Sequence, residues 1–251
     1  MPLQSAAAIF AIVAAPFVGS FLAVVAIRWH EDRGVVAGRS ACDACGTTLA
    51  ARDLVPVLSF VWLRGRCRAC GARIDPIHPV MEAGALALAL WAASVTTGWI
   101  LVASCILGWT LLTLAAMDWR TGILPDILTL PLVASGLIVA WWIDSASLPG
   151  HLVGAVAGFA VFALLAEAYR HLRGRDGLGL GDAKLLAGGG AWLSWVALPT
   201  VVLYAAAIGL ASVLIAGAAG RTVRAGDSLA FGPPLAAAIW LAWLYGPLVP
   251  G

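Results

Sequence analysis

The chain has 251 residues, of which 62% are apolar and only 11% are charged, and its formal net charge is +2. Soluble domains carry roughly 25% charged residues, so a soluble fold of this size is excluded. A net charge this small gives no reason to expect nucleic acid as a partner, and we expect none.

Long apolar runs recur along the whole chain. A helix needs about 20 apolar residues to cross a bilayer core, and continuous rather than alternating runs exclude a barrel. We therefore predict an all-α, polytopic helical membrane protein with about eight transmembrane helices, at residues 6–27, 79–97, 100–117, 125–143, 150–169, 183–198, 199–219 and 229–246. The run at 183–198 is the weakest, because it is short and holds three consecutive glycines; a tilted or re-entrant segment is the alternative.

The basic residues predict the orientation of these helices. All 15 lysine and arginine residues fall in alternate loops between the apolar runs or, for Lys184, at the start of the run at 183–198. The positive-inside rule places those loops in the cytoplasm and both termini outside. Basic residues follow the first run instead of preceding it, which is the reverse of a secretory signal peptide, so we interpret residues 6–27 as a retained span.

Four cysteines form two C-x-x-C pairs in the first cytoplasmic loop, and each pair is followed by glycine. This spacing predicts a structural zinc site with four thiolate ligands: Cys42, Cys45, Cys67 and Cys70. Disulfide or redox use is disfavoured because the cytoplasm is reducing. A loop of about 50 residues is also too small for a substantial core, which a metal can replace. Glu82, early in the next run, is expected to pair with a basic residue of this loop.

Three aspartates lie at the ends of predicted spans, all at the cytoplasmic face. Ionisable residues at such depths are functional candidates. Two carboxyl groups that share a site can divide the roles of general acid and water-activating base, which is the minimum for aspartic peptide hydrolysis. Asp118, at a helix carboxyl end, and Asp182 are the candidates for that pair, although Asp182 could instead cap its helix. Asp126 follows Pro125 at a helix start, where a structural role is ordinary.

Alternating glycines precede the last of these aspartates in the stretch GLGLGDAKLL. Gly177, Gly179 and Gly181 allow backbone conformations that other residues avoid, and they let a substrate chain approach closely. We expect the following residues to support the site: Gly179, Gly181, Lys184 and Asp126.

Several blocks occur in one order along nearly the whole chain: GSFLAVVAIR, the cysteine pairs with LVPVLSFVWLRGRCRACG, HPVMEAG, MDWRTGILPDILTLP, GLGLGDAKLLAGGGAWLSW and FGPPLAAA. In these blocks the chain resembles the prepilin peptidases, which are bacterial inner-membrane aspartic peptidases of the Gly-x-Gly-Asp type. The resemblance implies that Asp118 and Asp182 are catalytic and that the four cysteines bind zinc. The expected domains are a first transmembrane helix at 1–27, a zinc-binding segment at 28–78 and a peptidase core at 79–251.

The resemblance also implies a substrate and a location. The substrate would be a type IV prepilin or a type II secretion pseudopilin, whose basic leader is cut after a glycine at the cytoplasmic face of the inner membrane. Many members also methylate the new amino terminus with S-adenosylmethionine, an activity that here rests on resemblance alone. The chain departs from the family at His78, where tyrosine is usual, and at Arg120, where a second aspartate or similar polar residue is common.

Two other classes compete with a peptidase. A proton-coupled transporter would use the aspartates, but transporters usually show internal repeats and sites near the midplane, and no repeat is visible here. A membrane thiol oxidoreductase would use the C-x-x-C pairs, but it requires the first loop to lie outside, against the distribution of arginines.

Overall fold

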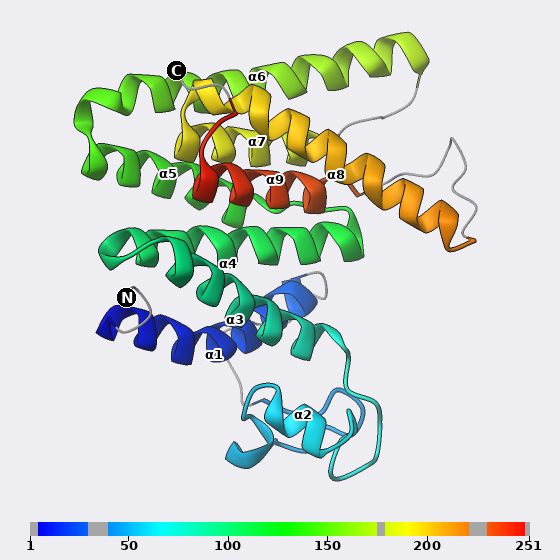
Figure 1. Cartoon of the computed structure of the whole chain (residues 1–251). Coiled ribbons are helices and arrows are strands. Elements are labelled where there is room, and N and C mark those ends of the chain that lie inside the picture. Colours follow the sequence, from blue (N-terminus) through cyan, green and yellow to red (C-terminus); the bar gives the residue numbers. More distant parts are fainter. Residues whose placement is uncertain (1–4, 30–39, 175–178, 221–229, 249–251) are drawn as a thin grey trace. The chain divides into compact units, whose positions relative to one another are not determined.

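The computed structural model describes residues 5–29, 40–174, 179–220 and 230–248, and over these residues its regular structure is helical apart from two isolated β-bridges (Figure 1). Six helices are long and apolar enough to cross a membrane: α1 (Ala6–Arg28), α3 (Ile77–Val95), α4 (Gly98–Thr121), α5 (Asp126–Ile143), α6 (Leu148–Arg173) and α8 (Leu198–Ala218). The shorter elements are α2 (Leu58–Trp62), α7 (Leu180–Leu193), α9 (Gly232–Tyr245) and the 3-10 turns η3 (Ala51–Asp53), η4 (Ser145–Ser147) and η5 (Trp195–Ala197).

The predicted all-α class is confirmed, and a helix occupies each of the eight predicted runs. The helices α7 and α9 have only 14 residues each. At a rise of about 1.5 Å per residue they extend about 21 Å, which is less than the roughly 30 Å of a hydrocarbon core. The number of complete crossings therefore stays a prediction. The chain divides into two compact units, Met1–Thr113 and Leu114–Gly251, and the boundary lies within α4.

In the first unit, α1 packs against α3 through small residues. The buried face of α1 consists of alanines and one glycine: Ala8, Ala11, Ala15, Gly19, Ala23 and Ala26. Gly19 has no room for a side chain, because a Cβ there would lie 2.5 Å from the Met81 carbonyl oxygen and 2.8 Å from the Glu82 Cα. Small residues allow this close approach, which is a usual way for helices to associate in lipid.

In the second unit, α7 is the central element. It packs against α5, α6, α8 and α9 (Figure 1), and ten of its fourteen residues are buried. Each of its three consecutive glycines faces a different neighbour. A Cβ on Gly188 would meet Leu132 of α5, one on Gly189 would meet Ile239 of α9, and one on Gly190 would meet the backbone of α6. The glycine run that made this segment a weak span in the sequence is therefore what lets three helices surround it.

Candidate active site and metal centre

Two buried carboxyl groups meet at one end of the second unit. Asp118 lies in the last turns of α4 and is 7% exposed, and Asp182 lies in the first turn of α7 and is 8% exposed. The two groups are close enough to interact electrostatically. Of the three aspartates considered from the sequence, these are the two that the fold buries together.

Each carboxyl group is held by one backbone hydrogen bond. The Gly232 N–H donates to Asp118 Oδ2 at 2.9 Å, and the Gly179 N–H donates to Asp182 Oδ2 at 3.3 Å. Asp182 Oδ1 is buried and has no hydrogen-bond partner among the described residues. A buried oxygen without a partner costs free energy, so its presence calls for an explanation. A proton or water molecule shared with Asp118 would supply the missing partner.

Gly232 is not among the site residues predicted from the sequence. It is the first residue of α9, and the next two residues are Pro233 and Pro234. Proline has no N–H, so Gly232 supplies the free amide of this helix start and directs it at Asp118. A Cβ at position 232 would lie 2.6 Å from Asp118 Oδ2 and 2.8 Å from its Cγ. Glycine is therefore the residue that permits this contact.

The third aspartate lies outside the buried pair. Asp126 is the first residue of α5, its side chain is 58% exposed, and its Oδ1 lies 2.5 Å from Lys184 Nζ. This ion pair joins the starts of α5 and α7, two residues beyond Asp182. The predicted supporting residues Lys184 and Asp126 thus contact each other, and the helix-start role expected for Asp126 agrees with this position.

The glycines before Asp182 act differently from the expectation. Neither Gly179 nor Gly181 has a positive φ, so the backbone conformation that we expected them to permit is not adopted there. Gly181 instead allows close packing, since a Cβ would lie 2.9 Å from the Leu124 Cβ. Gly177 lies outside the described residues.

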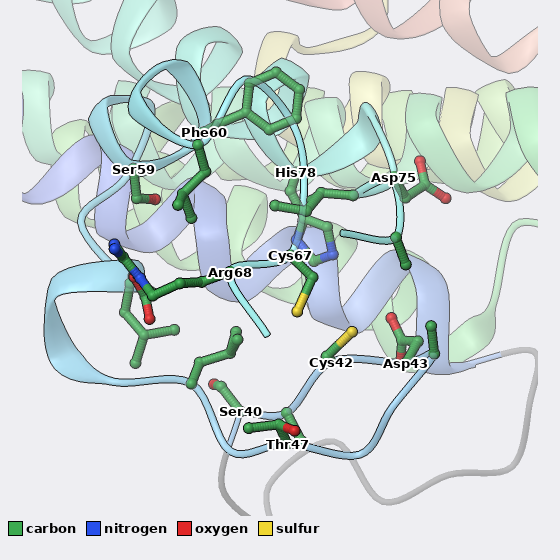
Figure 2. A pocket seen from close by; sticks show the side chains of 18 of the residues that line it. Ser40, Cys42, Asp43, Thr47, Ser59, Phe60, Cys67, Arg68, Asp75 and His78 are labelled. Carbon is green, nitrogen blue, oxygen red and sulfur yellow. The ribbon is translucent and has the colours of Figure 1, made fainter. Parts of the chain in front are cut away.

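The four paired cysteines of the first unit converge on one point. Their sulfur atoms all lie within 4.8 Å of one another, and Cys42 Sγ is 3.9 Å from Cys70 Sγ. A tetrahedral zinc site with bonds of about 2.3 Å requires sulfur atoms about 3.8 Å apart, so the arrangement fits a metal ion. Figure 2 shows Cys42 and Cys67 with their sulfur atoms turned toward each other. Two independent redox dithiols would not need this convergence.

The two cysteine turns have the same backbone construction. In the first, Gly46 N–H bonds to the Cys42 carbonyl, and in the second, Gly71 N–H bonds to the Cys67 carbonyl. Both glycines have a positive φ, +68° and +72°, which favours glycine over other residues. Each turn is closed by a β-bridge at the same offset, Ala41 with Thr48 and Arg66 with Arg73. The glycine that follows each pair in the sequence is explained by this turn.

The pKa values of two cysteines in the cluster differ strongly from the ordinary value of a thiol. The hydrogen bond between Cys45 Sγ and the Thr47 hydroxyl lowers the pKa of Cys45 to about 6. A backbone hydrogen bond from Ala72 favours the Cys70 thiolate, but the neighbouring sulfurs and burial together raise the pKa of Cys70 to about 11. Four crowded sulfurs cannot all carry negative charge without a cation, and a bound dication would supply it.

A pocket of about 480 Å³ lies beside this cluster, lined by the cysteine loop together with residues of α1 and α3 (Figure 2). Glu82 of α3 lines it and is 7% exposed. Its Oε2 accepts a 2.6 Å hydrogen bond from the Val57 N–H. The partner shown for Glu82 is thus a backbone amide of the loop, and the expected pairing with a basic loop residue stays a prediction.

The residue that Glu82 holds is strained. Val57 has φ +61° and ψ −51°, and the Leu58 N–H bonds to the Pro56 carbonyl across it, which makes a γ-turn of the rare positive-φ kind. A β-branched residue in this region costs on the order of 1–3 kcal/mol and persists only where its surroundings hold it. The Glu82 hydrogen bond is the contact that connects this turn to α3.

Two family models together match most of the chain. The Bacterial Peptidase A24 N-terminal domain matches residues 13–96, and the Type IV leader peptidase family matches residues 105–214. A Prepilin leader peptidase/N-methyltransferase of Burkholderia pseudomallei (strain 1026b) is 42% identical, over 91% of this chain and 82% of its own length. The chain belongs to the type IV leader peptidase family. The protein of the same name from Aeromonas hydrophila is 37% identical, over 91% of this chain and 87% of its own length. The one from Dickeya chrysanthemi is 38% identical, over 87% of this chain and 86% of its own length.

No solved structure matches this leader peptidase. The leader-peptidase match at residues 105–214 includes Asp118, Asp126, Asp182 and Lys184, and the N-terminal match at 13–96 includes the four cysteines and Glu82. Gly232 lies beyond both matched segments. Its contact with Asp118 is thus a finding that rests on the fold.

Proposed function

We propose that this leader peptidase is an aspartic endopeptidase that removes the basic leader of type IV prepilins or type II secretion pseudopilins, after a glycine and at the cytoplasmic face of the inner membrane. The observation that carries the proposal is the buried pair Asp118 and Asp182, with one unpartnered oxygen, in a chain whose relatives are named prepilin leader peptidases. The same relatives are named N-methyltransferases, so methylation of the new amino terminus belongs to the proposal.

The two carboxyl groups divide the work of hydrolysis. A water molecule between them loses a proton to the ionised carboxylate, and its oxygen attacks the carbon of the scissile carbonyl. The protonated carboxyl group gives its proton to the carbonyl oxygen. The intermediate then collapses, the C–N bond breaks, and the nitrogen leaves as an amine after taking a proton. One water is consumed, and the products are a leader carboxylate and a new amino terminus.

The backbone contacts fit this division. Gly232 and Gly179 each engage the Oδ2 atom of their aspartate, which fixes the side chain. The Oδ1 atom of Asp182 is left for the water or the shared proton. Holding both carboxyl groups in place before substrate arrives reduces the entropy that must be lost in the reaction.

The cysteine cluster would hold zinc in a structural role. Four thiolates complete a tetrahedral shell and leave no open position for substrate. S-adenosylmethionine, when bound, would supply a methyl group to the new, neutral amine. The amine lone pair forms the C–N bond, the electrons of the broken C–S bond leave with sulfur, and the amine releases a proton to solvent.

The zinc assignment predicts the effect of removing one ligand. Cys42→Ser or Cys67→Ser should abolish bound zinc and unfold the cysteine loop, while the distant spans stay inserted, because one lost thiolate opens the tetrahedral shell. Zinc content per chain, measured after purification without chelators, checks this. Cys105→Ala is the matched control, since Cys105 is buried in α4 away from the cluster, and it should keep its zinc. Wild-type protein without zinc would contradict the assignment.

The proposed topology has eight crossings with both termini outside. It agrees with the second unit, where the end of α4 and the starts of α5, α7 and α9 meet around the two aspartates. Alternating crossings bring those four ends to one face. Reporter fusions after Gly98 or Ser147 should be active in the periplasm, and fusions after Asp53 or Gly174 in the cytoplasm. A cytoplasmic signal at Ser147 would rule out this arrangement.

The proposed activity is tested with the purified protein and a prepilin in lipid. We expect loss of the leader and a product whose first residue is the one after the leader glycine. A prepilin that stays intact with zinc-loaded protein, or a product cut elsewhere, would reject the proposal.

A further inference from the structure

We propose that the short helix α2 lies in the surface of the bilayer, with an apolar face among the lipids and nearby arginines at anionic headgroups. Leu58, Val61 and Trp62 form this face, and they are 68%, 67% and 85% exposed. Because they recur at i, i+3 and i+4, they lie on one side of the helix. We call these three residues the apolar face of α2. Large apolar side chains that gather on one exposed face mark an interaction surface.

The opposite side of α2 already has neighbours. Ser59, Phe60 and Leu63 are only partly exposed and line the pocket of the first unit, where Figure 2 shows Ser59 and Phe60. The last turns of α1 line the same pocket with Val24 and Ile27. One side of α2 therefore faces the protein near the end of a membrane span, and the apolar face is the side that a further contact can reach.

A hydrogen bond fixes the level of α2 along the spans. The N–H of Val57, the residue before α2, donates to Glu82 Oε2 at 2.6 Å. Glu82 is the sixth residue of α3. It therefore lies about 7.5 Å from the start of that span, at a rise of about 1.5 Å per residue. Helices that lie in a bilayer surface bury their apolar face about 5–10 Å into the boundary between headgroups and acyl chains. The start of α2 is thus held at the level where such helices lie.

The charge beside the apolar face also matches a lipid surface. Arg64 and Arg66 follow α2 closely and Arg52 precedes it, and all three are exposed. Basic residues next to a span are attracted to the anionic lipids of the cytoplasmic leaflet, where the proposed topology places this loop. Tryptophan is enriched at the same interface. The basic leader of a prepilin would instead be repelled by these arginines, so lipid is the partner that fits both features. The inference uses only the topology from the proposed function.

The test places a photoreactive benzoylphenylalanine at position 62 of the full chain, in vesicles of phosphatidylethanolamine and phosphatidylglycerol with prepilin added. After irradiation, the peptide that contains position 62 should carry a phospholipid adduct. The same label at position 59, on the pocket side of α2, is the matched control and should capture no phospholipid. Zinc content equal to that of the wild type shows that the labelled loop is folded. Capture of prepilin or of a second copy at position 62, no capture, or equal lipid capture at both positions would overturn the proposal.

The arginines are tested in the same labelled protein. Phosphatidylglycerol should form a larger share of the adducts than its share of the vesicle lipid, because the arginines attract its charge. In a variant with Arg64→Gln and Arg66→Gln, that share should fall to the share in the vesicle. Arg170→Gln is the control, since Arg170 is an exposed arginine of α6 that pairs with Glu167, and it should leave the share unchanged. An unchanged share in the double variant would overturn the role of the arginines.

A second measurement avoids the unnatural side chain, in case it disturbs the loop. The difference in fluorescence between the wild type and Trp62→Phe belongs to Trp62. In vesicles this difference should be quenched by lipids that carry bromine high on their acyl chains and protected from iodide in the water. Quenching by iodide without quenching by the brominated lipid would place Trp62 in water and overturn the proposal, while prepilin cleavage by the same preparation would leave the proposed function intact.

Discussion

Asparagine at position 182 or at position 118 is expected to reduce prepilin cleavage by about 100- to 10,000-fold, because general acid–base catalysis contributes about that much and needs both carboxyl groups. Asparagine has nearly the same shape as aspartate and can still accept the backbone hydrogen bonds from Gly179 or Gly232. It cannot exchange a proton with water or with the leaving group. Initial rates on a prepilin in lipid, with zinc content matched between variants, measure the effect.

Asp126→Asn is the matched control for these two substitutions. Its side chain is exposed and its ion pair with Lys184 is of the surface kind, which contributes about 0.2–1 kcal/mol. We expect this variant to keep at least about a tenth of the wild-type rate, because the loss of an ion pair worth about 1 kcal/mol would slow the reaction by less than tenfold. If Asp126→Asn were as inactive as Asp182→Asn while Asp118→Asn still cut the prepilin, then Asp126 would be the catalytic residue of this stretch.

Gly232→Ala should be nearly as damaging, although no side chain is lost. The new Cβ would lie 2.6 Å from Asp118 Oδ2, so either the carboxyl group or the start of α9 must move. Displacement of a reacting group by about 1 Å can cost about 100-fold in rate, and we expect a loss of that order. The KM for prepilin should change much less than kcat if Gly232 positions a catalytic group, as we propose for Asp118.

Gly217→Ala provides the comparison for that substitution. Gly217 is also a helical glycine of the second unit, but no atom lies within 4 Å of a Cβ placed there. Its replacement should leave the cleavage rate within about twofold, since alanine is favoured over glycine in a helix by about 1 kcal/mol. Equal activity of Gly232→Ala and the wild type would show that the contact with Asp118 does not position the carboxyl group.

Features that depend on local pattern could be predicted from the sequence. The two C-x-x-C pairs converge as their spacing indicated. Each pair forms the same kind of short turn, and a tetrahedral site takes two ligands from each turn. The helices follow the apolar runs to within a few residues. Asp118 and Asp182 lie at helix ends that the pattern already marked, and both are buried, while their catalytic pairing stays a prediction.

Features that depend on contacts far apart in the chain could not be predicted. Gly232 lies 114 residues from the aspartate that it contacts, and the glycine and two prolines around it indicated only the start of a helix. The hydrogen bond from the Val57 N–H to Glu82 was also not predicted, because it depends on a strained turn that presents the N–H there. The roles of Gly179 and Gly181 were also misjudged, since close packing cannot be distinguished from a special backbone conformation by sequence alone.

The central claim is that Asp118 and Asp182 activate water directly, without a covalent intermediate. Its most direct test is a single-turnover reaction of excess enzyme with a prepilin in water labelled with the heavy oxygen isotope, quenched at short times and analysed by intact-protein mass spectrometry. We predict that the released leader carries one heavy oxygen in its new carboxylate and that the enzyme never gains mass. Enzyme that carries the leader as a covalent adduct would contradict the mechanism.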